Sequence, residues 1–193
     1  MLLQIVSLLI SSLLLLQNGA ANKDAQPKSY EDAEAYEVYS AILPTSWAWQ
    51  VAKAQSLVIR EETMPYKMCL RPDAKSEAVV GPAISEYVRL NEKPWLLQRS
   101  LSIEKPYELV GSDEFKKSAF KGDWENFYKR RPNSGGWIGL SAVGFNADRT
   151  VAVAFMTHAC GSLCGGGDFY VLQKKDGKWI PLKLGGTSCG FAV

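Results

Sequence analysis

The clearest alternation of side-chain types lies in the last third of the chain. In residues 150–158, valine and phenylalanine occupy one set of alternate positions, and alanine and methionine occupy the other. This period of two, with apolar residues on both faces, predicts a strand inside a sheet. Asn146 and Asp148, which precede it, are typical of a turn. Residues 137–145 and 150–158 are therefore expected to form a hairpin.

A second pair of strands is expected at 168–174 and 178–184. Asp176 and Gly177 lie between them, and this dipeptide suits a type I′ turn, which needs positive φ at both central positions. Together with the first hairpin, the pair predicts an antiparallel meander at the C-terminus. Pro181 has no N–H to donate to a neighbour, so the last strand is expected at an edge of the sheet.

The rest of the chain alternates between helical and extended patterns. Apolar residues recur at helical spacing in three segments, which are 30–43, 82–91 and 113–131. Extended structure is expected in three others, which are 56–63, 95–103 and 106–111. Pro82 suits the first turn of the second helix. The predicted fold class is α+β, with an antiparallel β-sheet, a C-terminal meander and about three helices packed on one face.

The connection between the two strand pairs has the most unusual composition. Residues 159–167 contain Cys160 and Cys164, followed by Gly165, Gly166 and Gly167. Glycine tolerates positive φ and lets another backbone approach closely. We interpret the segment as a small-residue loop pinned by a disulfide. Together with the only histidine, His158, the three glycines would form a loop that faces a ligand.

Three chemical interpretations of this segment remain as alternatives. Zinc binds sets of three cysteines and one histidine, which Cys160, Cys164, Cys189 and His158 would supply, but the spacing is not diagnostic and no metal site is predicted. A thiol nucleophile would pair Cys160 or Cys164 with His158, and it would have to stay reduced. A phosphate-binding loop is the weakest, because the lysine and hydroxyl of a P-loop are missing and the glycines open a strand.

The N-terminus has the composition of a signal peptide. Residues 2–16 are an almost uncharged apolar run of about 15 residues, short for a membrane span of about 20. Gly19 and Ala21 satisfy the small-x-small cleavage rule, although no lysine or arginine precedes the run. We expect a signal peptide at 1–21, a flexible lead at 22–29 and a single α+β domain at 30–193. An uncleaved anchor is the alternative.

Export would make the four cysteines candidates for two disulfides, for which three connectivities are possible. We favour Cys160–Cys164 with Cys69–Cys189. The shorter bridge would shape the local turn, and the longer one would join the first half of the chain to the C-terminus. Cys69 as a buried free thiol is the alternative.

Composition narrows the range of partners. The chain has 193 residues, of which 47% are hydrophobic, and a formal net charge of +2 with mixed charges. This is the composition of a globular protein, without the concentrated basic surplus of a nucleic-acid-binding domain. Six tryptophans invite a comparison with sugar-stacking platforms, but they are dispersed and are expected to pack in the core. Basic residues interleave with aromatic ones in 112–132, where acidic residues offset most of their charge.

Three segments resemble those of a group of uncharacterised exported bacterial proteins. They are VGFN at 143–146, CGSLCGGG at 160–167 and GKW at 177–179. The resemblance implies a single extracytoplasmic domain, periplasmic or secreted, and it implies no activity, substrate or catalytic residue.

Taken together, these patterns favour a noncatalytic, exported binding or interaction domain. Its partner would be an unknown protein or another component of the cell envelope, with no nucleic acid, no cofactor and no stable membrane span after cleavage. No catalytic residue is assigned. The alternative is a thiol- or histidine-dependent hydrolase that uses His158 with Cys160 or Cys164.

Overall fold

The structure is a computed structural model that describes residues 26–45, 49–119, 122–187 and 189–192. The expected signal peptide and the first four residues of the expected lead lie outside the described residues. None of the described helices is long and apolar enough to span a membrane.

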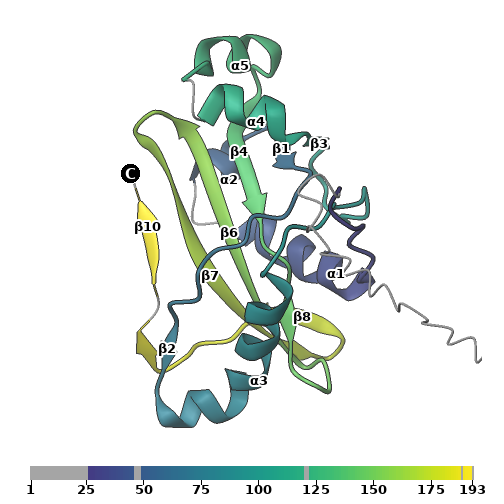
Figure 1. Cartoon of the computed structure of the whole chain (residues 1–193), viewed down its shortest axis with the longest axis vertical. Coiled ribbons are helices and arrows are strands. Elements are labelled where there is room, and N and C mark those ends of the chain that lie inside the picture. The colour runs from purple at the N-terminus through teal and green to yellow at the C-terminus, as the bar shows by residue number, and fades with distance from the viewer. Residues whose placement is uncertain (1–25, 46–48, 120–121, 188, 193) are drawn as a thin grey trace, which may run out of the picture.

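A large mixed sheet forms the centre of the molecule (Figure 1). Its strands follow the order β10-β7-β6-β4-β1-β3, with β5 paired to β6 and β8 paired to β7. The strands are β1 (Ser56–Arg60), β3 (Tyr107–Val110), β4 (Ser134–Leu140), β5 (Gly144–Phe145), β6 (Val151–Gly161), β7 (Cys164–Lys175), β8 (Lys178–Pro181) and β10 (Gly190–Ala192). A separate two-stranded sheet pairs β2 (Arg71–Pro72) with β9 (Gly186–Thr187).

The α+β class and the C-terminal meander are confirmed. β6, β7 and β8 are successive antiparallel neighbours, and Asp176 and Gly177 have the positive φ angles, 50° and 74°, expected of the turn between β7 and β8. β4 and β6 form the predicted hairpin, which pairs Trp137 with Ala159. The parallel pairing of β1 with both β3 and β4 was not predicted.

Helices cover both faces of the sheet, and the prediction that they pack on one face is wrong. They are α1 (Ala33–Ile42), continued by a 3-10 turn (Leu43–Thr45), and α2 (Trp49–Lys53), α3 (Ala74–Leu90), α4 (Ser112–Ala119) and α5 (Trp124–Arg130). On one face, α1 packs with Ala152, Ala154 and Met156 of β6. On the other, α3 covers the valines of β6, while α4 and α5 cover Trp137. A strand that is apolar on both faces needs cover on both.

The second helix, α3, is longer than predicted. It begins at Ala74, where the side chain of Asp73 caps it by accepting a hydrogen bond from the Ser76 amide at 2.8 Å. Pro82 therefore lies in the middle of the helix and not in its first turn. Both Pro82 and Ala78, whose carbonyl loses its helical partner, are exposed, so water can satisfy that carbonyl. Residues 95–103, which were expected to be extended, form only isolated β-bridges, in which Leu96 pairs with Ser29 and Glu62.

Candidate functional site

The predicted ligand-facing residues lie at one end of the β6–β7 hairpin, and they do not form a loop. Gly165, Gly166 and Gly167 belong to β7 and pair with residues 159, 158 and 157 of β6. The turn itself comprises only Ser162 and Leu163. The expectation that His158 and the three glycines form a loop is therefore wrong, because the glycines are paired in the sheet ladder.

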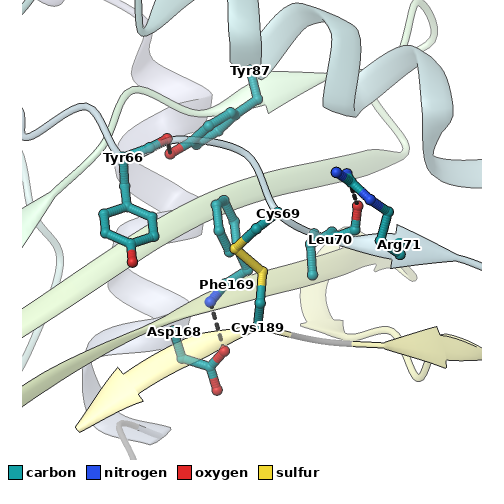
Figure 2. Close-up of a disulfide and its surroundings, with 8 residues drawn as sticks. All are labelled: Tyr66, Cys69, Leu70, Arg71, Tyr87, Asp168, Phe169 and Cys189. Carbon is teal, nitrogen blue, oxygen red and sulfur yellow. Dashed lines mark hydrogen bonds between the residues drawn. A yellow bond between two sulfur atoms is a disulfide. The ribbon is translucent and has the colours of Figure 1, made fainter.

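All four cysteines are joined in the two expected disulfides. Cys160–Cys164 closes the end of the hairpin, with a Cα–Cα distance of 5.1 Å. Cys69–Cys189 joins residues 120 positions apart, with a Cα–Cα distance of 5.9 Å (Figure 2). No cysteine is free, so neither sulfur beside His158 is a thiol. Two disulfides in a chain of this size indicate an oxidising, extracytoplasmic environment.

His158 is part of the packing of the sheet. Its side chain is 3% exposed, and its Nε2 lies 2.6 Å from the carbonyl oxygen of Gly135. Burial lowers the pKa of His158, which keeps the ring neutral near pH 7. Because a carbonyl only accepts, Nε2 carries the proton and donates it. The imidazole thus fastens β6 to the start of β4.

The described part of the chain contains no cluster of side chains that could bind a metal ion. No group of three or more histidine, cysteine, aspartate or glutamate side chains is placed to hold a metal ion there. All three cysteines considered as zinc ligands are in disulfides, Cys160 with Cys164 and Cys189 with Cys69, and zinc requires thiolates.

Two glycines near this end of the sheet are explained by close packing. A Cβ at Gly167 would lie 2.4 Å from Cζ of Phe155, so the absence of a side chain makes room for that ring. Gly136 in β4 has φ of +100°, and a Cβ there would lie 2.2 Å from the carbonyl oxygen of Ala159. Gly167, the last residue of the glycine run, therefore serves the packing of the hairpin, as Gly136 does on the neighbouring strand.

The exposed end of the hairpin, which we call the hairpin tip, consists of residues Cys160–Cys164. Leu163 is 88% exposed there. The hydroxyl of Tyr128 in α5 donates a hydrogen bond of 2.9 Å to the carbonyl of Cys160. Residues 159–167 contain no charged side chain. The tip is thus a rigid, uncharged protrusion with one large apolar side chain at its end.

Leu163 was missed in the sequence analysis. A signal for it was present, because a leucine in a three-residue segment between two bridged cysteines cannot reach the core. The residue types that carry chemistry in this segment, cysteine and histidine, stabilise the hairpin in the structure.

A second cluster of aromatic side chains lies beside the other disulfide. The ring of Tyr66 stacks on Phe155, with centroids 4.1 Å apart, and it also contacts Phe191 in β10, which is 40% exposed. The carbonyl of Tyr66 accepts a hydrogen bond from the hydroxyl of Tyr87 in α3 (Figure 2). These contacts and Cys69–Cys189 hold the C-terminal strand on the edge of β7.

The described tryptophans outside α2 provide no platform for sugar. Trp124, Trp137 and Trp179 are buried, and Trp95 packs against the core around α1. The three buried rings have no free face on which a pyranose could stack, and Trp95 is partly buried.

No protein-family model, curated protein or solved structure matches this chain.

Proposed function

We propose that this chain is an exported, noncatalytic binding domain, cleaved after Ala21 and active outside the cytoplasm through protein contacts. The proposal rests on which chemical groups are available at the end of the β6–β7 hairpin. Its two sulfurs are bridged, and its imidazole is buried and bonded to a backbone carbonyl. The side chains that remain exposed in the turn are Ser162 and the apolar Leu163. Such a surface offers an apolar contact but no thiol and no exposed imidazole, and a serine hydroxyl reacts only where an adjacent base activates it.

Export is supported by two independent features. The apolar run and the small-x-small site at 19–21 have the form of a signal peptide, and the two disulfides suit an oxidising compartment. The resemblance of three segments to exported bacterial proteins agrees with both.

The test compares the full chain, exported by the cells that produce it, with the variant His158→Gln. Glutamine keeps an N–H that can reach the Gly135 carbonyl. Sequencing should give Asn22 as the first residue of the mature chain, and alkylation without reductant should label no cysteine. An envelope component should co-purify in fixed proportion with both forms of the protein.

The opposite result would be chemical turnover. If the purified chain converts an envelope component, and if His158→Gln abolishes that conversion while the variant stays folded, the chain is an enzyme. A thiol labelled in the native protein would favour the thiol-dependent alternative in the same way.

A further inference from the structure

Building on the proposed binding function, we propose that the hairpin tip is the contact element and that its partner is a protein with an uncharged, apolar pocket. The pocket would take the side chain of Leu163. Four large apolar side chains of the described residues are exposed: Val79, Val88, Leu163 and Phe191. Leu163 is the most exposed of them, at 88%, and it lies in the turn of the β6–β7 hairpin, whose end extends beyond β10 (Figure 1).

Leu163 differs from an ordinary exposed leucine because the backbone of the hairpin tip is constrained. Single apolar side chains on a surface are normal and need no explanation. Here three constraints act on the same few residues: the disulfide between Cys160 and Cys164, the hydrogen bond from Tyr128, and the close packing of Gly136 on Ala159. A contact element fixed in advance loses little conformational entropy on binding, so more of the gain from burying the leucine appears as affinity.

The chemistry of the hairpin tip selects the kind of pocket. Residues 159–167 carry no charge, so a charged cavity would lose solvation and gain no partner. On the neighbouring helix α5, Lys129 pairs with Glu125, and Arg130 pairs with Glu114 of α4. These two pairs offset basic charge beside the hairpin tip, which disfavours an anionic glycan. A convex, neutral, apolar tip fits a concave, neutral, apolar pocket.

A lipid surface is the less favoured partner. A single myristoyl chain, which is far more apolar than one leucine, gives only marginal membrane binding. One leucine at the end of a hairpin would therefore not hold a domain on a bilayer. Inside a well-packed protein pocket, a single buried anchor side chain can dominate the affinity.

The experiment places the photo-crosslinking residue p-benzoylphenylalanine at position 163 in the full exported chain. Positions 79, on α3, and 191, on β10, receive the same residue in separate proteins as matched exposed controls. Cells that export each protein are irradiated, and the adducts are identified by mass spectrometry. We expect one discrete protein adduct from position 163, with the crosslink inside an apolar pocket of that protein.

Affinity for that purified protein then measures the role of the leucine. We expect Leu163→Met to bind as the native chain does, Leu163→Ala to bind about 10- to 100-fold more weakly, and Leu163→Asp to bind more than 100-fold more weakly. Val79→Asp should bind as the native chain does. Because residue 163 is exposed, thermal unfolding of its variants should be unchanged, which separates lost binding from lost folding.

Three other outcomes would overturn the inference. A protein adduct only from position 79 or 191, with affinity indifferent to Leu163→Asp, would place binding elsewhere and leave the proposed binding function standing. A lipid adduct at 163 would replace the protein pocket by a membrane. Absence of any adduct from the three positions, together with absence of a co-purifying component, would remove both the contact element and the proposed function.

Discussion

Gly136 lies against the backbone of Ala159, so closely that a Cβ at position 136 would fall 2.2 Å from the carbonyl oxygen of Ala159 and 2.8 Å from Cα of Cys160. This contact joins the first residues of β4 to the end of β6, one residue before the bridged hairpin tip. The φ angle of Gly136, +100°, is one that other residues rarely adopt. The position therefore requires glycine for two separate reasons.

Gly136→Ala is expected to lower the free energy of unfolding by more than about 3 kcal/mol. Positive φ costs an alanine about 1–2 kcal/mol, and the collision with a sheet backbone adds to it because neither strand can move away. Gly177→Ala is the matched control, since Gly177 has φ of +74° and open space around it. The control should lose only the φ penalty. Urea denaturation of both variants measures the difference, and equal losses would show that the collision is relieved.

The local features of this fold were predictable because they depend on neighbours in the sequence. Alternation identified the central strand, Asp176 and Gly177 identified the turn between β7 and β8, and the cysteines gave the correct pairing. Each of these patterns is decided within about ten residues or by a small number of possible pairings. The signal at Pro82 was misleading, because an exposed proline is tolerated within α3.

The remaining features depend on distant parts of the chain. The parallel pairing of β1 with β3 and β4 joins segments that no local pattern connects. The roles of His158 and Gly167 are likewise set by what faces them, a carbonyl at 135 and a ring at 155. The sequence identifies a histidine and a glycine whose residue types could serve chemistry or structure. Only their packing shows that both serve the structure.

The two disulfides are expected to differ in their effect on stability. In the chain-entropy model, a bridge spanning 120 positions stabilises by about 5 kcal/mol and one spanning 4 positions by about 2 kcal/mol. The double variant Cys69→Ser with Cys189→Ser should therefore be less stable than Cys160→Ser with Cys164→Ser. Each double variant serves as the control for the other in calorimetry. A larger loss at the hairpin tip would mean that native-state packing, and not loop length, decides the effect.

Gly167→Ala is expected to destabilise the protein by about 1–3 kcal/mol through overpacking. The added methyl would meet the ring of Phe155, which cannot turn aside because Tyr66 stacks on it. Gly161→Ala tests the same change nearby, where the nearest atom is Cβ of Cys164 at an ordinary 3.5 Å. That variant should unfold within about 1 kcal/mol of the native chain. Chemical denaturation compares the two, and similar losses would show that Phe155 has room to move.

The buried imidazole is expected to make the free energy of unfolding depend on pH below about 6.5. Burial lowers the pKa of His158 in the folded chain, whereas in the unfolded chain it titrates near 6.5. Below that pH the unfolded chain takes up a proton that the folded chain does not. The free energy of unfolding therefore falls as pH falls, by at most about 1.4 kcal/mol per pH unit. Denaturation at pH 7.5 and pH 5 measures the change.

His158→Gln is the control that assigns this pH dependence to one residue. The chain has a single histidine, so the variant should show no loss of stability over the same interval. Carboxylates whose pKa is lowered by ion pairs, such as Glu34 and Glu114, lose their stabilising contribution mainly below about pH 5. An NMR titration of the one imidazole should give a folded-state pKa below 6.5. A pKa at or above that value would mean that the ring is open to water and available as a proton donor, which would revive the histidine-dependent alternative.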